Sequence, residues 1–485
     1  MEDKNLKPKV LWDNFKQICA IPHPSKHEKE ITEWLLKWAK EHGISVVVDS
    51  VGNIIFSKPA TKGYENRKGV VLQGHIDMVP QKNSDKVHDF TKDPIKMVIG
   101  NDGWVRANGT TLGADNGIGC AAAMAVLQSN DIEHGPLEVL VTVDEETGMT
   151  GAFGLKPNLL KGDILINLDS EDEGELYVGC AGGMDANFTM NYSMEKTPDN
   201  MQGIDIAITG LKGGHSGMDI ILGRANANKL LMRLLKKASQ TLDLRVASID
   251  GGSLRNAIPR EAFATVAIPS GKVKEFNEFV AVFTDIVSNE FSVTEPDLSV
   301  SAKPIDTPKE VINRTEQGKI INLVYAIPNG VMRMSDSMQS LVETSTNLAI
   351  VKAENGKLLV ANLLRSSVDT AKAALGYKME AIAELAGAEI ELAGAYPGWK
   401  PNMDSAIMKT MIQTYESMYG KKPEIKAIHA GLECGLLGGV YPNWDMISFG
   451  PTIRSPHSPD ERVHIESVEK FWNFLVETLK NVPVK

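Results

Sequence analysis

The sequence of 485 residues is poor in cysteine, with only four, and none of them forms a CxxC pair. Cys19, Cys120, Cys180 and Cys434 are scattered along the chain, which argues against a disulfide framework and against cysteine ligands for zinc. No apolar run approaches the roughly 18 residues that a membrane span requires. The charged N-terminus also lacks an apolar signal segment. We therefore expect a cytoplasmic protein with reduced thiols.

Repetitive and strongly polar tracts are absent as well, so we expect the whole chain to fold. The formal net charge is −11, which disfavours nucleic acid and anionic membranes as partners because both repel a negative surface. A chain of 485 residues exceeds the size that a single hydrophobic core usually serves. At least two domains are therefore expected.

The first part of the sequence alternates apolar strand-like runs with helical patterns. Apolar runs occupy residues 70–72, 137–143 and 164–168, and an Ala-rich helical stretch covers residues 117–127. Strands that are apolar throughout and alternate with helices are typical of a mostly parallel sheet with helices on both faces. This part of the chain is therefore predicted to be an α/β domain.

Two further elements precede those strands. Helical spacing of apolar residues predicts a helix over residues 25–41, with Ser25 as its N-terminal cap. The alternating runs at residues 45–48 and 53–56 are separated by a glycine-containing turn, which indicates a hairpin.

The pattern changes beyond about residue 186. Between residues 204 and 301 the predicted order is β-α-β-β-α-β, which suits a ferredoxin-like unit. A second, weaker unit follows, with a hairpin over residues 348–364 that turns at Asn355 and Gly356. The α/β pattern returns after residue 397. We predict one α/β domain made of residues 1–185 and 397–485, interrupted by an α+β domain over residues 186–396, with a binding cleft between them.

Acidic residues and one histidine follow the predicted strands at the points where the strands end. His75, Glu145, Glu146 and Asp169 come after apolar runs, and Asp115 opens the Ala-rich helix. The carboxyl ends of parallel strands meet at one edge of a sheet, so these side chains are expected to lie close together.

His457 joins this set from the returning segment. Histidine and carboxylate ligands suit zinc, cobalt or manganese better than copper or iron–sulfur centres. A single catalytic ion takes three protein ligands, whereas five are available here, which favours two divalent metal ions with a shared carboxylate. Asp77 is placed to accept the second N–H of His75. If Glu145 and Glu146 lie on an extended strand end, they point in opposite directions, so that one binds metal and the other faces water.

Each of these residues alone has an ordinary structural explanation. Asp115, for example, is a suitable helix cap. Gly117 and Gly119 are unfavourable in the first turn of a helix, which favours a functional reason for the segment. The combination of all the segments is what favours a catalytic metal centre.

Six runs carry a resemblance to a known family. They are LQGHIDMVP at residues 72–80, LGADNGIG at 112–119, DEETG at 144–148, INLDS at 166–170, KGGHSG at 212–217 and HSPDE at 457–461. In these runs the chain resembles the M20 family of co-catalytic metallopeptidases, and within it the aminoacyl-histidine dipeptidase branch. The resemblance extends over nearly the whole chain and implies a zinc-peptidase-like catalytic domain with an inserted lid domain.

The resemblance also implies a role for each site residue. Glu145 would be the general base, and Asp77 the partner of His75. The implied metal ligands are His75 and Asp169 for one ion, Glu146 and His457 for the other, and Asp115 as the bridge, with Zn²⁺ first among the metals and Co²⁺ or Mn²⁺ as alternatives.

Four further residues are implied to contact the substrate. They are His215, Asn256 and Arg365 in the lid domain, and Gly431 in the loop over residues 431–435. His215 would donate a hydrogen bond to the oxyanion, and Arg365 would offer a planar fork to the terminal carboxylate of a peptide.

The implied activity is hydrolysis of Xaa-His (carnosine-like) and other unblocked dipeptides by a hydroxide shared between the two ions. The lid would close over the small peptide substrate, and a homodimer through the lid domain is expected. Two alternatives remain open: an amidohydrolase of the same superfamily that acts on N-acyl amino acids, and a peptide-binding protein without catalytic activity.

Overall fold

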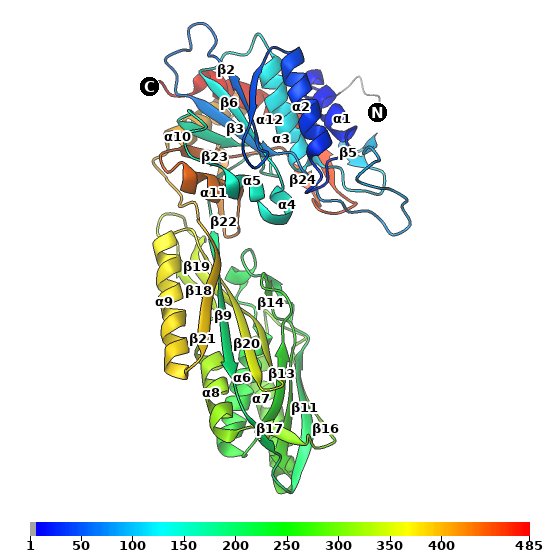
Figure 1. Cartoon of the computed structure of the whole chain (residues 1–485), viewed down its shortest axis with the longest axis vertical. Helices are drawn as coiled ribbons and strands as arrows, with labels where there is room; N and C mark the ends of the chain where they lie inside the picture. Colours follow the sequence, from blue (N-terminus) through cyan, green and yellow to red (C-terminus); the bar gives the residue numbers. More distant parts are fainter. Residues whose placement is uncertain (1–5) are drawn as a thin grey trace. The chain divides into compact units, whose positions relative to one another are not determined.

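The structure is a computed structural model that describes residues 6–485 (Figure 1). The chain divides into two compact units. The first contains Met1–Gly179, Pro401–Ala427 and Leu432–Lys485, and the second contains Cys180–Lys400 and Ile428–Gly431. The first unit therefore combines the blue and red ends of the chain in Figure 1, whereas the second is green to yellow. Within residues 6–485, no helix is long and apolar enough to cross a membrane.

An eight-stranded sheet is the centre of the first unit, with the strand order β1-β2-β6-β3-β7-β23-β8-β22. The four strands from β6 to β23 run parallel, whereas β2 and β8 pair with them antiparallel. All six residues of β3 are buried, so both faces of the sheet are covered, as the apolar runs predict. The strands are β1 (Ser45–Val48), β2 (Ile54–Lys58), β3 (Val70–His75), β6 (Leu137–Thr142), β7 (Ile164–Asn167), β8 (Glu175–Cys180), β22 (Glu424–Ile428) and β23 (Asp445–Ser448).

Helices pack on this sheet and on one another, with α3 lying against both β3 and α1. The N-terminal end of α2 differs from the prediction. The helix begins at Lys29, and the hydroxyl of Ser25 caps nothing but donates to Oδ2 of Asp77 at 2.8 Å. The main helices of this unit are α1 (Lys9–Cys19), α2 (Lys29–Glu41), α3 (Ala114–Gln128), α10 (Ala406–Tyr419), α11 (Glu433–Val440) and α12 (Ile465–Asn481).

A small four-stranded sheet holds the returning segment in the first unit, with the order β24-β25-β5-β4. The short hairpin of β24 (Ile453–Arg454) and β25 (Arg462–His464) pairs with β5 (Trp104–Ala107), which in turn pairs with β4 (Met97–Ile99). The turn of this hairpin carries His457, whose φ of 57° is left-handed and uncommon for a residue with a side chain. The hairpin thus fixes a histidine from the end of the chain on the first unit.

The second unit contains a nine-stranded sheet, and the first part of it has the predicted β-α-β-β-α-β order. Its strands lie in the order β16-β11-β15-β13, all antiparallel, as in a ferredoxin-like unit. The elements are β11 (Met201–Thr209), α6 (Ala227–Thr241), β13 (Arg245–Gly251), β15 (Ala262–Pro269), α7 (Val273–Glu290) and β16 (Ser299–Ile305).

The strands of the predicted second unit extend the same sheet and do not form a separate repeat. The hairpin of β19 (Val342–Glu354) and β20 (Lys357–Ser366) turns at Asn355 and Gly356, both with positive φ, as predicted. β20 pairs with β9 (Gly182–Asn191), and β9 pairs with the edge strand β21 (Glu389–Tyr396). Two helices complete the unit, α8 (Arg314–Ala326) and α9 (Asp369–Ala386).

Candidate metal centre

The ends of the parallel strands gather the predicted residues at one edge of the first-unit sheet. His75 is the last residue of β3, and Glu145 opens the one-turn helix α4 (Glu145–Gly148) after β6. Asp169 follows two residues after the end of β7. Parallel pairing of β3 with both neighbours places these three ends side by side.

Two groups of potential ligands share the carboxylate of Asp115. In the first group, His75 Nε2 lies 3.1 Å from Asp115 Oδ1 and 3.4 Å from Asp169 Oδ1. In the second, His457 Nε2 lies 3.2 Å from Asp115 Oδ2 and 3.0 Å from Glu146 Oε2. The two oxygens of Asp115 therefore face different histidines, in the arrangement that a bridging carboxylate requires.

These separations of 3.0–3.4 Å are close to those between ligands of a bound divalent cation, and three of the four are slightly shorter. Ligand atoms that each lie about 2.0–2.2 Å from a tetrahedral ion are about 3.3–3.6 Å apart. Glu146 Oε1 and Asp169 Oδ1 are buried and accept no hydrogen bond. Buried carboxylate oxygens without a donor are costly, and a cation would satisfy them. The histidine and carboxylate groups of this site are thus able to bind metal.

Asp77 orients His75 through its main-chain oxygen as well as through the predicted carboxylate. His75 Nδ1 lies 3.0 Å from the main-chain oxygen of Asp77, and the carboxylate atom Oδ1 lies farther away, at 3.4 Å. The Asp77 carboxylate also accepts the main-chain N–H groups of Glu145 at 3.0 Å and Glu146 at 3.2 Å. Asp77 therefore positions both the histidine and the two glutamates.

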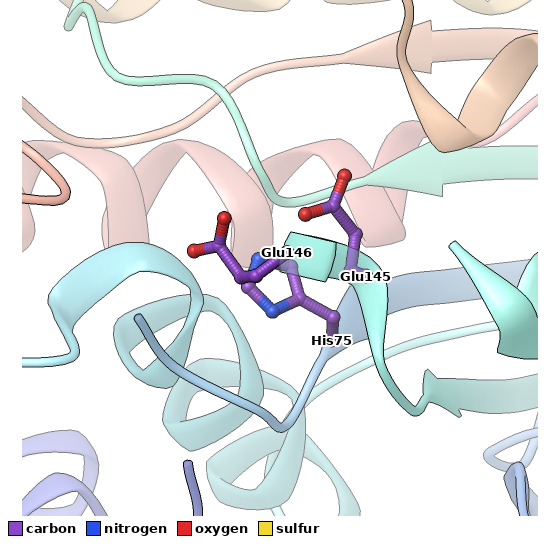
Figure 2. Close-up of side chains that lie close together, drawn as sticks. All are labelled: His75, Glu145 and Glu146. Atoms are coloured by element: carbon purple, nitrogen blue, oxygen red, sulfur yellow. The ribbon is translucent and has the colours of Figure 1, made fainter. Parts of the chain in front are cut away.

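Glu145 and Glu146 lie in the first turn of a helix, not on the extended strand end that we assumed. Their carboxylates nevertheless diverge, one on each side of the His75 imidazole (Figure 2). One oxygen of each glutamate lies within 4.8 Å of a His75 nitrogen. The two side chains can thus take different roles at the same centre.

Burial dominates the electrostatics of the carboxylates. It raises the pKa of Asp169 to about 7 and also raises that of Glu145, with neighbouring carboxylates adding to both shifts. The histidines respond to the same charges. Hydrogen bonds to Asp115 and Glu146 raise the pKa of His457 to about 11, and Asp169 raises that of His75 although burial opposes it. The site is therefore strongly attractive to positive charge.

Close packing explains the glycines at the start of α3. A Cβ atom on Gly119 would lie 2.7 Å from the main-chain oxygen of Leu168, and one on Gly117 would lie 2.9 Å from the Phe15 ring. The side chain of Asn116 fills the space beside Gly119 and donates to that Leu168 oxygen at 2.7 Å. These contacts hold the Asp115 segment against the residue that precedes Asp169.

Sequence reasoning assigned no role to two buried glutamates of the first unit. Glu433 accepts hydrogen bonds from Gln73 Nε2 at 2.6 Å and from Thr142 Oγ1 at 2.7 Å. Gln73 lies on β3, the strand that ends at His75. Glu461 is 2% exposed and accepts only main-chain N–H groups. A charged residue inside the apolar run Leu432 to Leu437 is the signal that would have identified Glu433 as buried.

The second unit contains the residues predicted to contact substrate, and two of them are neighbours. The short strand β12 (Gly214–His215) pairs with β14 (Ala257–Ile258), and Ser216 N donates to the main-chain oxygen of Asn256 at 2.8 Å. Nδ1 of His215 accepts the N–H groups of Gly217 at 3.2 Å and Met218 at 3.1 Å. Because Nδ1 is an acceptor, the proton of the neutral imidazole is on Nε2.

Arg365 and Gly431 also lie close together, near the hydroxyl of Tyr396. Arg365 Nη1 donates to Tyr396 Oη at 3.4 Å, and a Cβ on Gly431 would lie 3.2 Å from the same oxygen. The side chain of Arg365 is buried, its Nε has no partner, and within residues 6–485 it forms no ion pair with a carboxylate. A buried guanidinium without an anion is the feature expected of an anion-binding site.

A histidine and carboxylate centre at the carboxyl edge of a parallel sheet is typical of hydrolases that use divalent metal ions. The model of Peptidase family M20/M25/M40 matches residues 71–481, and the chain belongs to this family. It is 50% identical over 484 residues to the cytosol non-specific dipeptidase of Escherichia coli (strain K12), covering 100% of both chains.

Two solved structures are similar to this chain. Aminoacylhistidine dipeptidase from Vibrio alginolyticus matches with a TM-score of 0.96 and 51% identity, covering 100% of this chain and 99% of that one. Aminopeptidase PepT from Bacillus cereus ATCC 10987 matches with a TM-score of 0.57 and 17% identity, covering 98% of this chain and 99% of that one. The latter likeness concerns the fold alone.

We expect Asp115→Ala to lose nearly all bound Zn²⁺, because both ligand groups contain this carboxylate. Equilibrium dialysis of the metal-free protein against Zn²⁺, followed by elemental analysis, measures the stoichiometry. Asp404→Ala is the control, since that side chain is 96% exposed. Equal Zn²⁺ content in the two variants would contradict the assignment of Asp115 as a shared ligand.

Proposed function

We propose that this peptidase is a metal-dependent dipeptidase that hydrolyses Xaa-His and other unblocked dipeptides. The observation that carries the proposal is the pair of ligand groups sharing Asp115. It is supported by the full-length identity of 50% to a cytosol non-specific dipeptidase. The name of that relative also supports a cytoplasmic location.

We assign five residues as ligands for two divalent ions, most suitably Zn²⁺. The donor set of imidazole nitrogen and carboxylate oxygen supports zinc and is also compatible with cobalt or manganese. Bound divalent ions supply an activated water and polarise the carbonyl group of the substrate. The assigned ligands are His75 and Asp169 for one ion, Glu146 and His457 for the other, and Asp115 between them.

Glu145 acts as the general base in this proposal. It takes a proton from the attacking water and delivers the proton to the leaving amine. Burial raises the pKa of its carboxyl group. A general base works best when its pKa lies near the working pH. The backbone of Glu145 is fixed by the Asp77 carboxylate, so the base is held in place by a hydrogen bond of 3.0 Å.

His215 stabilises the negative oxygen that develops on the scissile carbonyl carbon. Its Nδ1 is occupied by two main-chain donors, which leaves the N–H of Nε2 for the substrate. Burial lowers the pKa of His215, and the charge of Arg365 lowers it further, so the ring remains neutral at neutral pH. A neutral imidazole with a fixed tautomer provides a hydrogen-bond donor at a fixed position.

Arg365 binds the terminal carboxylate of the dipeptide. Its guanidinium is buried and lacks a carboxylate partner within residues 6–485, and a substrate carboxylate would provide one. We assign Asn256 and Gly431 to the same binding region, because Asn256 is next to the strand that pairs with His215 and Gly431 contacts Tyr396. Recognition of this carboxylate restricts the enzyme to the C-terminal peptide bond of short peptides.

We also propose a homodimer formed through the second unit. Exposed apolar side chains gather where α6, α7 and α8 meet, around a cavity of about 530 Å³. Val282 is 58% exposed and Ile286 is 43% exposed, and both lie on α7. An apolar surface of this kind is typical of a protein interface.

Ala-His hydrolysis by the Zn²⁺-loaded protein tests the proposed function. We expect turnover of Ala-His, no turnover of N-acetylated Ala-His, and loss of activity after a chelator removes the metal. Amine release measures the reaction, and re-addition of Zn²⁺ should restore it. Turnover restricted to N-acyl substrates would instead identify an amidohydrolase, and no turnover of either would favour a binding protein.

Replacement of the general base should separate chemistry from metal binding. Glu145→Gln is expected to lower kcat by about 10²- to 10⁴-fold, the usual contribution of general acid–base catalysis. Bound Zn²⁺ should remain at the parental level, because Glu145 is not one of the five assigned ligands. Parental activity in a metal-loaded Glu145→Gln variant would exclude this residue as the base.

Removal of the guanidinium should affect only substrates with a free carboxylate. Arg365→Ala is expected to raise KM for Ala-His by about 10- to 100-fold, because a hydrogen bond to a charged group contributes about 1.5–3 kcal/mol. The KM for the C-terminal amide of Ala-His should change little. Arg233→Ala is the matched control, since Arg233 is partly exposed and already paired with Glu290 at 2.6 Å. An equal effect of Arg365→Ala on both substrates would refute the assignment.

A further inference from the structure

Glu461 holds the segment that carries Asp115, using both oxygens of its buried carboxylate. Oε2 accepts the main-chain N–H groups of Leu112 at 2.7 Å and Gly113 at 3.0 Å. Oε1 accepts those of Ala114 at 2.7 Å and Asp115 at 3.3 Å. Four consecutive donors are therefore satisfied by a single side chain that is 2% exposed.

The backbone of this segment is shaped to bind an anion. Gly113 has a left-handed φ of 71° immediately before α3, and Asp115 and Asn116 at the start of α3 are not in a helical conformation. Successive N–H groups in an irregular turn of this kind can form a concave anion site. The structural role of Glu461 is thus that of a helix cap supplied by a distant part of the chain.

Two observations indicate more than capping. One of the capped residues is Asp115, whose side chain lies within 3.2 Å of both His75 and His457. Glu461 also stands four residues after His457, and its own N–H donates to Ser458 O at 2.9 Å within the same turn. A single carboxylate therefore connects the two chain segments that present Asp115 and His457.

We propose that Glu461 is a positioning residue that sets the separation of Asp115 and His457 and thereby the metal affinity of the centre. It contacts neither the ions nor the substrate, and it acts through the main chain of the Asp115 segment. This inference rests on the proposed metal site. Without Glu461 the direct link between the two segments would be lost, and ordering the Asp115 segment would reduce the free energy gained on metal binding.

Glu461→Gln tests the proposal with a side chain of the same shape. The amide nitrogen of glutamine cannot accept a hydrogen bond, so two of the four hydrogen bonds are lost. Its N–H groups would then face two main-chain N–H groups of the Asp115 segment. We expect the affinity of the metal-free protein for Zn²⁺ to fall by about 10- to 100-fold, the usual effect of changing a group that orients metal ligands. Competition with a chromophoric chelator measures the affinity, and circular dichroism of the metal-free protein checks that it is folded.

Glu295→Gln is the matched control in the second unit. Glu295 is 1% exposed and accepts the main-chain N–H groups of Lys212 at 2.7 Å and Ala225 at 3.0 Å, far along the chain from every assigned ligand. It should lower the temperature of unfolding without changing the affinity for Zn²⁺. Glu461→Asp keeps the charge and both acceptor oxygens, so its loss of affinity should be smaller than that of Glu461→Gln.

The results separate this inference from the proposed function. If the parent protein binds no Zn²⁺, or binds as much as Asp115→Ala, the metal site itself is wrong. If the parent binds Zn²⁺ and Glu461→Gln binds it equally well while unfolding at a lower temperature, Glu461 is only a helix cap and the inference is overturned. Should Glu461→Gln fail to fold, parental affinity in Glu461→Asp with a lowered unfolding temperature would overturn it equally.

Discussion

Repulsion among buried carboxylates is the constraint on which the first unit depends. Asp115, Asp169, Glu145 and Glu146 lie at one edge of the sheet with only two histidines among them. Burial raises the pKa of Asp169 to about 7 and that of Glu145 in the same direction, which means that ionising all of these groups at neutral pH is unfavourable without compensating positive charge. Bound divalent cations would provide that charge. The stability of this region and its affinity for metal are therefore two aspects of one electrostatic balance.

The scaffold meets this constraint with main-chain dipoles, because further cationic side chains would compete with the metal. Asp77 accepts the N–H groups of Glu145 and Glu146, and Glu461 accepts four N–H groups of the Asp115 segment. The pKa of Asp77 is lowered to about 2 despite burial, by its hydrogen bonds to His75, Glu145 and Ser25, so this carboxylate keeps its charge. Burial and the nearby charge of Asp115 raise the pKa of Glu461 to about 7, and its four main-chain donors oppose this shift. The ligands come from strand ends, from a helix start and from a C-terminal hairpin. The complete centre therefore forms only when both parts of the first unit have folded together.

The parallel sheet and the convergence of His75, Asp169 and the two glutamates could be predicted from the sequence. Apolar runs mark buried strands, and the carboxyl ends of parallel strands must meet at one edge. The contacts that hold the ligands in place could not be predicted. Many of them involve main-chain N–H groups, and contacts to the main chain leave no pattern in the sequence. Hence the Asp77 main-chain oxygen, rather than its carboxylate, lies closer to His75, and Ser25 binds Asp77 instead of capping α2. In the second unit, the pairing of β9 with β20 and β21 joins one sheet across a long stretch of sequence, which local periodicity cannot indicate.

The second unit also contains a buried charged group without a partner of opposite charge, but there the group is positive. A buried guanidinium without an anion lowers stability, and Arg365 is retained in that state with a tyrosine hydroxyl as its only hydrogen-bond partner within residues 6–485. His215 is likewise fixed by main-chain donors, in the tautomer that carries its proton on Nε2. In the absence of substrate, the unpaired guanidinium lowers stability and the fixed imidazole loses conformational freedom. Both features would be useful only when a negative group binds. A site that is organised before binding loses less entropy on binding, so under the proposed function this unfavourable arrangement of the free protein would favour tight and selective recognition of an anionic substrate.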